Sequence, residues 1–126
     1  MKKYFLLTLY LLSISSITHA ENFVQGNVQE MLDKSKLERI CIDFKLLKSA
    51  LDLYRLDHYK YPTTEEGLKM LVQTDKVTKE PLDPWSTPYQ YKNNSMDISL
   101  SSLGADKKTG GNGLYADITL DSCIAE

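Results

Sequence analysis

Two aspartates that bracket a glycine-rich segment are the residues whose types and spacing best suit metal chemistry. Asp106 and Asp117 flank Asn112 and a group of glycines near the end of the chain. Calcium binds six to eight oxygens and accepts carboxylate, amide and backbone carbonyl ligands together. The spacing is not that of an EF-hand, and two carboxylates make a weak site. From these residues alone, an ordinary glycine loop with two solvated acids is the favoured interpretation, and a calcium site is the alternative.

The remaining residues offer little for catalysis. His58 lies beside Asp57 in a helical pattern, where a histidine is more often a surface residue than a general base. The chain has two histidines in all, which are too few for a histidine zinc cluster. It also lacks a phosphate-binding glycine motif and a G-x-S-x-G nucleophile elbow. We therefore expect a protein that is not an enzyme.

Residues 1–20 have the pattern of a signal peptide. Lys2 and Lys3 precede an uncharged run from Tyr4 to Ile17, which is shorter than the roughly 20 residues that a membrane span needs. We predict cleavage after Ala20 and export, so that the mature protein is periplasmic or secreted. An uncleaved N-terminal anchor is the alternative. The polar residues 21–32 are expected to form a flexible segment, and residues 33–126 the globular domain.

The two cysteines, Cys41 and Cys123, would both remain in the exported chain. An even number of cysteines in an oxidising compartment favours a disulfide, and two buried free thiols are the alternative. No C-x-x-C spacing is present, so redox catalysis has no support.

Length and composition indicate one ordinary globular domain. The chain has 126 residues, of which 42% are hydrophobic and 25% charged, and its formal net charge is −2. A protein without a basic excess cannot neutralise a phosphate backbone, so we expect no nucleic-acid partner.

A long helix is predicted from about Gln29 to Tyr59. Its apolar residues recur at three- and four-residue steps and would form one buried stripe: Leu37, Ile40, Cys41, Phe44, Leu47, Leu51 and Tyr54. Opposed charges at four-residue spacing, such as Arg39 with Asp43 and Lys48 with Asp52, mark the other surface. Pro62 should stop the helix, and a capping box of Thr63 and Glu66 should start a second, short helix.

The second half of the domain reads as a small antiparallel sheet. Three prolines surround Trp85, which is predicted to fill the core from an irregular loop. Residues 89–91 and 96–100 alternate like strands around the turn residues Asn93 and Asn94, and residues 116–120 can form a last strand. The predicted fold is α+β, with a long N-terminal helix packed on a three-stranded antiparallel sheet.

Several segments, in a fixed order, resemble the globular domain of the type II secretion system major pseudopilin (protein G) family. The resemblance covers about residues 33–120 and is carried by A-L-D-L-Y-R-L-D at 50–57, Y-P-T-T-E-E-G-L at 61–68, D-P-W at 83–85, P-Y-Q-Y at 88–91, S-L-G-A-D at 102–106, G-G at 110–111 and A-D-I at 116–118. It implies a long helix on a small antiparallel sheet and a role in protein transport through a periplasmic pseudopilus.

The resemblance also implies a calcium site in the loop before the last strand. The ligands would be the side chains of Asp106 and Asp117 and the backbone carbonyl of Leu103. Leu114 and Tyr115 stand where the family often carries acidic residues. We therefore expect a calcium site weaker than that of the family, or none.

The N-terminal region departs from the resemblance. The pseudopilin family begins with a short basic leader, a Gly-Phe-Thr-Leu-like cleavage point and a long apolar helix, whereas Glu21-Asn22-Phe23 opens a polar stretch here. We expect no stable membrane anchor after cleavage. The predicted function is that of a soluble, exported accessory protein that contacts pseudopilins or other components of a type II secretion or related pilus system. The alternative is a free-standing secreted or periplasmic binding module, calcium-dependent or not, with no link to secretion.

Overall fold

The computed structural model describes residues 2–125, with side chains described from residue 21 onward. The chain divides into two compact units, residues 1–35 and residues 36–126, which are described separately. Helix α1, Lys2–His58, contributes to both units.

In the first unit, helix α1 includes the residues that were predicted to be flexible. Residues 21–32 are helical, and their side chains are exposed to solvent. Whether this helical segment is flexible in solution stays a prediction. Gln, Glu, Met, Leu and Lys dominate residues 29–34 and all favour the helical backbone. The Gln29 Nε2 amide also donates to Asp33 Oδ1 at 2.8 Å, one helical turn further on. Cleavage after Ala20 stays a prediction.

In the second unit, α1 buries the predicted apolar stripe. Ile40, Phe44, Leu47, Leu51 and Tyr54 are buried, Cys41 is partly buried, and Leu37 is exposed at the rim. The helix ends at His58, one residue before the predicted end at about Tyr59, because Tyr59 adopts a left-handed backbone with φ of 60°. A left-handed residue directly after the last helical one is a common way for a helix to end.

The predicted capping box forms, but it closes a turn instead of starting a helix. The Thr63 amide donates to Glu66 Oε2 at 2.7 Å, and the Glu66 amide donates to Thr63 Oγ1 at 3.1 Å. Gly67, with φ of 60°, then reverses the chain, so that helix α2, Lys69–Gln73, begins later than predicted. Leu71 is its buried residue.

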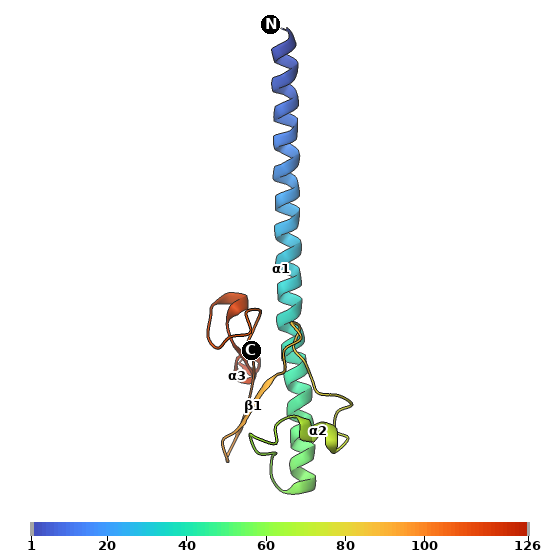
Figure 1. The fold of residues 1–126 in the computed structure, drawn as a ribbon, viewed down its shortest axis with the longest axis vertical. Coiled ribbons are helices and arrows are strands. Elements are labelled where there is room, and N and C mark those ends of the chain that lie inside the picture. The colour runs from blue at the N-terminus through green and yellow to red at the C-terminus, as the bar shows by residue number, and fades with distance from the viewer. Residues whose placement is uncertain (1, 126) are drawn as a thin grey trace. The chain divides into compact units, whose positions relative to one another are not determined.

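Three strands form the predicted antiparallel sheet, in the order β1-β2-β3. Strand β1, Gln90–Asn93, pairs with β2, Ile98–Ser102, and β2 pairs with β3, Ile118–Thr119. Figure 1 shows β1 and α2 beside the C-terminal part of α1. A 3₁₀ turn, Gly113–Tyr115, precedes β3, and helix α3, Leu120–Ile124, follows it. The α+β prediction is confirmed, whereas α3 was not predicted.

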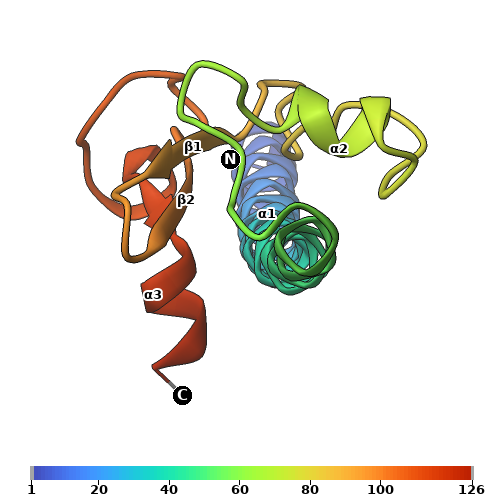
Figure 2. The ribbon, with the colours of Figure 1, turned by 90° about the horizontal axis from the view of Figure 1, so that it is seen from below.

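The core of this unit lies between α1, α2 and the sheet. In Figure 2, the sheet lies to the left of α1 and α2 lies to its upper right. Trp85 is partly buried against this core, and the Lys36 ammonium lies 5.6 Å from the centre of its ring system. The buried hydrophobic residues are Ile40, Phe44, Leu47, Ala50, Leu51, Tyr54, Leu68, Leu71, Tyr89, Tyr91, Ile98, Leu100, Leu120 and Cys123.

Candidate functional site

The candidate calcium loop is the segment between β2 and β3, residues 103–117, and backbone hydrogen bonds close its neck. The Ala105 amide donates to the Leu114 carbonyl at 2.9 Å, and the Asp117 amide donates to the Gly110 carbonyl at 3.2 Å. Asp117 Oδ2 in turn accepts from the Gly110 amide at 3.1 Å. The loop is therefore held by its own main chain and by one of its two acids.

Two glycines allow the close approach that the loop requires. Gly104 has φ of 71°, and a Cβ atom there would lie 2.8 Å from the carbonyl oxygens of both Leu114 and Ala116. Gly111 has φ of 91°, and a Cβ atom there would overlap the Tyr115 carbonyl oxygen. Larger residues would force these backbones apart. The segment thus brings several backbone carbonyl groups together.

The two acids of the loop differ in what they contact. Asp106 Oδ1 accepts from the Lys108 amide at 3.0 Å, which makes a local turn at an exposed tip. Asp117 Oδ1 is buried and has no hydrogen-bond partner in the described part of the chain. A buried carboxylate oxygen without a partner costs free energy unless a donor or a cation reaches it. Asp117 is therefore the residue of this loop that most fits a metal.

The other residues predicted at this site contribute few ligand oxygens. Leu103 lies between the end of β2 and Gly104, at the start of the loop. Leu114 and Tyr115 add no carboxylate, and the Tyr115 side chain is exposed. Among the residues that the structure describes, no three His, Cys, Asp or Glu side chains gather as a metal cluster. The residues fit a weakly held cation better than a tightly held one.

A third aspartate, Asp83, organises the neighbouring loop of residues 81–88, and this role was not predicted from the sequence. Asp83 is only 3% exposed, and its Oδ1 accepts from the amides of Trp85 at 3.0 Å and Thr87 at 2.8 Å. Its Oδ2 accepts from the Ser102 hydroxyl at 2.7 Å. The aspartate between prolines was a usable turn signal, because Asp side chains often bond to amides further along the chain.

Ser102 joins this loop to the candidate calcium loop. Its side chain, fully buried at the end of β2, donates to Asp83 and accepts from the Gly104 amide at 3.2 Å. Gly104 is the glycine that faces the carbonyl groups of Leu114 and Ala116. The chain of contacts from Asp83 through Ser102 therefore positions the first turn of the candidate site.

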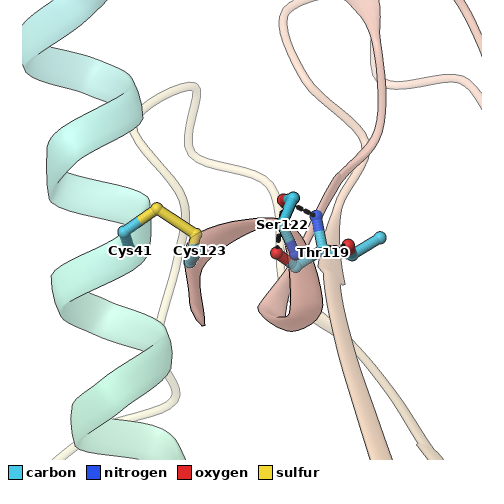
Figure 3. The surroundings of a disulfide bond; sticks show 4 residues. All are labelled: Cys41, Thr119, Ser122 and Cys123. Carbon is cyan, nitrogen blue, oxygen red and sulfur yellow. Dashed lines mark hydrogen bonds between the residues drawn. A yellow bond between two sulfur atoms is a disulfide. The ribbon is translucent and has the colours of Figure 1, made fainter. Parts of the chain in front are cut away.

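The predicted disulfide between Cys41 and Cys123 is present. It joins α1 to α3 with a Cα–Cα distance of 5.3 Å across a sequence separation of 82 residues (Figure 3). Beside it, Thr119 and Ser122 form a capping box at the start of α3: the Ser122 amide donates to Thr119 Oγ1 at 3.3 Å, and the Thr119 amide donates to Ser122 Oγ at 3.2 Å. A closed loop of this length stabilises the fold by about 4.5 kcal/mol in the chain-entropy model.

Two tyrosines fasten the sheet to its surroundings. The Tyr89 hydroxyl donates to Asp43 Oδ2 at 2.7 Å, and the Tyr91 hydroxyl donates to the Pro62 carbonyl at 2.8 Å. Burial, and then the bond to Asp43, raise the pKa of Tyr89 far above its usual value. Burial raises the pKa of Tyr91 to about 12. Both phenols therefore stay neutral donors that support the fold.

His58, the histidine considered for catalysis, packs at the end of α1. Its ring stacks on Tyr54 at a centroid distance of 4.0 Å, and its Nδ1 lies 3.0 Å from the Tyr54 carbonyl oxygen. These contacts stabilise the last turn of the helix.

The fold and the loop together define a pseudopilin-like protein, and comparison with known proteins identifies the family. The crystal structure of the major pseudopilin from the type 2 secretion system of enterohaemorrhagic Escherichia coli superposes with a TM-score of 0.62 and 34% identity, over 74% of this chain and 92% of that chain. The family model of type II secretion system protein G matches residues 27–121, and the chain belongs to that family.

Curated relatives agree with this assignment. The type II secretion system core protein G of Pseudomonas aeruginosa is 38% identical over 110 residues, which cover 75% of this chain and 78% of the relative. The core protein G of Vibrio cholerae is 34% identical over 111 residues, which cover 77% and 76% of the two chains. The predicted resemblance is thus confirmed, and the chain is a pseudopilin-like secretion protein.

Among the residues that the structure describes, no helix combines the length and the apolar character needed to cross a bilayer.

Proposed function

We propose that this chain is a soluble, exported component of a type II secretion system, which works in the periplasm through contacts with protein partners. The observation that carries the proposal is the match of residues 27–121 to the protein G family. Other pseudopilins or components of the secretion apparatus are the expected partners. The alternative of a free-standing binding module, unrelated to secretion, gains no support from these relatives.

Two further features support an exported protein. Residues 1–20 have the charge and hydrophobic pattern of a cleavable leader. The bond between Cys41 and Cys123 is of a kind that persists in oxidising compartments and is rare in the cytosol. Both features are consistent with a mature domain that begins at Glu21 and lies outside the inner membrane.

The experiment combines the site of cleavage with the effect on secretion. The protein is recovered from fractionated cells of its own host, and its N-terminus is mapped by peptide mass spectrometry. We expect a terminus at Glu21, release without detergent, and loss of secreted proteins from the medium after deletion of the gene. A retained leader in the membrane fraction would contradict the soluble form, and unchanged secretion would contradict the role.

We further propose that the loop of residues 103–117 binds calcium weakly. The supporting observation is the buried, unpartnered Oδ1 of Asp117, close along the chain to the carbonyl groups of Leu114 and Ala116. Asp117 would supply a carboxylate oxygen, with Asp106 and the Leu103 carbonyl as further ligands. The ion would neutralise a buried charge and join the two ends of the loop.

Calcium binding is tested by isothermal titration calorimetry on the protein as exported, with magnesium as the competing ion. We expect a dissociation constant in the range of about 0.1–1 mM, as in extracellular calcium modules. Asp117→Asn should abolish the heat of binding, whereas Asp97→Asn, in the turn between β1 and β2, should not. An absence of heat at several millimolar calcium would refute the site.

A further inference from the structure

Asn112 and Gly113 form the one Asn-Gly pair of the sequence. An asparagine in such a pair is chemically unstable, because the amide nitrogen of the next residue can attack the side-chain carbonyl carbon and close a five-membered succinimide ring. Glycine permits this attack best, since it has no side chain to block the approach or to restrict the backbone. Asparagine is accordingly among the residues that proteins of hyperthermophiles use sparingly.

The pair lies at an open place in the fold. Both residues are exposed, in the loop of residues 103–117, which extends away from α1 (Figures 1 and 2). A Cβ atom at Gly113 would meet nothing within 4 Å. Water and hydroxide can therefore reach the Gly113 amide, and no neighbouring group fills the space beside it.

The attacking nitrogen is not held by a hydrogen bond. In the part of the chain that the structure describes, the Gly113 amide has no acceptor, and the Asn112 side chain caps no backbone amide. An amide proton that is bonded within a protein becomes available to solvent only after that bond opens. The Gly113 amide can lose its proton to hydroxide without this step.

The backbone of Asn112 is extended, with φ of −137° and ψ of 150°. Ring closure requires rotation about its Cα–C bond, and the hydrogen bond from the Tyr115 amide to the Asn112 carbonyl, at 3.1 Å, opposes that rotation. This bond belongs to a single 3₁₀ turn, a class of structure whose hydrogen-bond geometry is poor. The reaction therefore needs the opening of one exposed turn and not the unfolding of a longer element.

The two asparagines of the turn between β1 and β2 are exposed to the same solvent but are held differently. The amide that follows Asn93 is that of Asn94, and it donates to the Asp97 carbonyl at 2.9 Å. The amide that follows Asn94 is that of Ser95, and it donates to Asn93 Oδ1 at 2.8 Å. In both cases the nitrogen that would attack is already bonded, so we expect these residues to react more slowly.

The remaining two asparagines of the chain, Asn22 and Asn27, lie within α1. The amides that follow them are bonded within the helix, and the helical backbone holds their Cα–C bonds in one conformation. Succinimide formation there would require the helix to open. Asn112 is therefore the asparagine that combines a glycine neighbour, an unbonded attacking amide and an exposed loop.

We propose that Asn112 is a site of spontaneous deamidation, through a succinimide formed with Gly113, which gives the loop of residues 103–117 a third carboxylate. Hydroxide removes the Gly113 amide proton, the nitrogen bonds to Asn112 Cγ, and the bond from Cγ to Nδ2 breaks and releases ammonia. Water then opens the ring. Cleavage between Cγ and the ring nitrogen gives aspartate, whereas cleavage between the main-chain carbonyl carbon and that nitrogen gives isoaspartate. The net reaction consumes one water, releases one ammonia and needs no oxidant or reductant.

The new carboxylate would join a loop whose acids are Asp106 and Asp117. Gly110, two residues before Asn112, is bonded to Asp117 through both its amide and its carbonyl. Calcium sites gain affinity as the number of charged ligands rises, so conversion at residue 112 is expected to tighten calcium binding. This consequence rests on the calcium site proposed above, whereas the modification itself does not.

Peptide mass spectrometry of the full chain, as recovered from the cell envelope, tests the modification. The chain is incubated at mildly alkaline pH, reduced, and digested with a lysine-specific protease at mildly acidic pH, which slows further reaction. The digest places Asn93 and Asn94 in one peptide, residues 93–107, and Asn112 in another, residues 109–126. We expect the second peptide to gain the mass difference between NH₂ and OH at least about tenfold faster than the first.

Two variants and the nature of the product test the chemistry. Asn112→Gln should lose the conversion, because its longer side chain would have to close a less favourable six-membered ring. Asn94→Gln is the matched control and should leave the conversion of residues 109–126 unchanged. The product should contain isoaspartate as well as aspartate, and its rate of formation should rise with pH. An Asn112 that stays intact or reacts no faster than Asn94, or a product that contains aspartate alone, would overturn the proposal.

Calorimetry with calcium tests the consequence for the loop. Asn112→Asp should tighten calcium binding about tenfold relative to the parent chain, whereas Asn94→Asp should leave it unchanged. An unchanged affinity in Asn112→Asp would refute a role of the third carboxylate in binding. If neither chain binds calcium while Asn112 still converts, the calcium site fails and the modification stands.

Discussion

The two loops beside the sheet are both organised by an aspartate, but their carboxylates are satisfied to different degrees. In the loop of residues 81–88, both oxygens of Asp83 accept hydrogen bonds from the protein. In the loop of residues 103–117, Asp117 has one bonded oxygen and one that is buried without a partner. A carboxylate whose two oxygens both accept hydrogen bonds fixes a turn, whereas one with an oxygen that lacks a hydrogen bond can still bind a ligand. The difference separates a structural loop from a candidate site.

Removing the Asp83 carboxylate should reduce the free energy of unfolding more than the other substitutions predicted below. Asp83→Ala leaves the amides of Trp85 and Thr87 and the hydroxyl of Ser102 without an acceptor, so we expect a loss of about 3–5 kcal/mol in the free energy of unfolding. Urea unfolding measures it, and the single tryptophan of the chain, Trp85, reports from within the loop. Asp75→Asn, at an exposed turn, is the control. Equal losses for the Asp83 and Asp75 variants would show that the buried hydrogen bonds contribute nothing.

Removing the Ser102 hydroxyl, which connects the two loops, should reduce the free energy of unfolding by less than Asp83→Ala does. Ser102→Ala removes the donor to Asp83 Oδ2 and the acceptor of the Gly104 amide, for an expected loss of about 1–3 kcal/mol. Hydrogen exchange then tells whether the loops are coupled, since the Thr87 and Ala105 amides should both lose protection. If only one loop responds, the two aspartates act independently.

Calcium should make the free energy of unfolding more sensitive to substitution of Asp117, while Asp83→Ala keeps the larger effect. Without calcium, Asp117→Asn should change the free energy of unfolding by less than about 1 kcal/mol, because no hydrogen bond to Oδ1 is lost. At calcium concentrations ten times the dissociation constant, the parent chain should gain about 1.4 kcal/mol and the variant nothing. Thermal unfolding with and without calcium measures both. A variant that gains as much as the parent would place calcium elsewhere.

The regular parts of the fold were predictable because burial and turn chemistry leave local signals. The stripe through Phe44 and Leu51 repeats with the helical period, and Asn93 and Asn94 predict the turn of the hairpin. The capping box at Thr63 was also predictable. However, it closes a turn that ends at Gly67 instead of starting a helix. Local chemistry thus predicted the contact and the second helix correctly, but placed the start of that helix too early.

The remaining features depend on tertiary contacts that no local pattern carries. Asp83 meets Ser102, a residue 19 positions later, only after the sheet has formed. Helix α3 has five residues and is held by its capping box and by the disulfide at Cys123, so it has no periodic signal of its own. The candidate ligands Asp106 and Asp117 were predicted as residues, but their unequal hydrogen bonding required the folded loop.

The smallest effect on stability is expected for Asp52, which lies near the protein surface. Asp52, on α1, accepts from Lys48 Nζ at 2.7 Å and from the Tyr61 hydroxyl at 2.6 Å, so both of its oxygens accept hydrogen bonds, as in Asp83, but its side chain is only partly buried. Desolvation raises the pKa of Asp52, but the hydrogen bonds from Lys48 and Tyr61 together outweigh it and hold the pKa below its usual value.

Because the pKa of Asp52 is lowered in the folded state, its contribution to stability is present above the ordinary aspartate pKa and is lost as pH falls through the lower, folded value. Solvent screening limits this contribution to less than about 1 kcal/mol. Asp52→Asn should therefore reduce stability slightly at pH 7 and leave it unchanged at pH 2, as measured by urea unfolding across that range. A loss at pH 7 as large as that of Asp83→Ala would mean that hydrogen-bond saturation, and not burial, determines what an aspartate contributes in this protein.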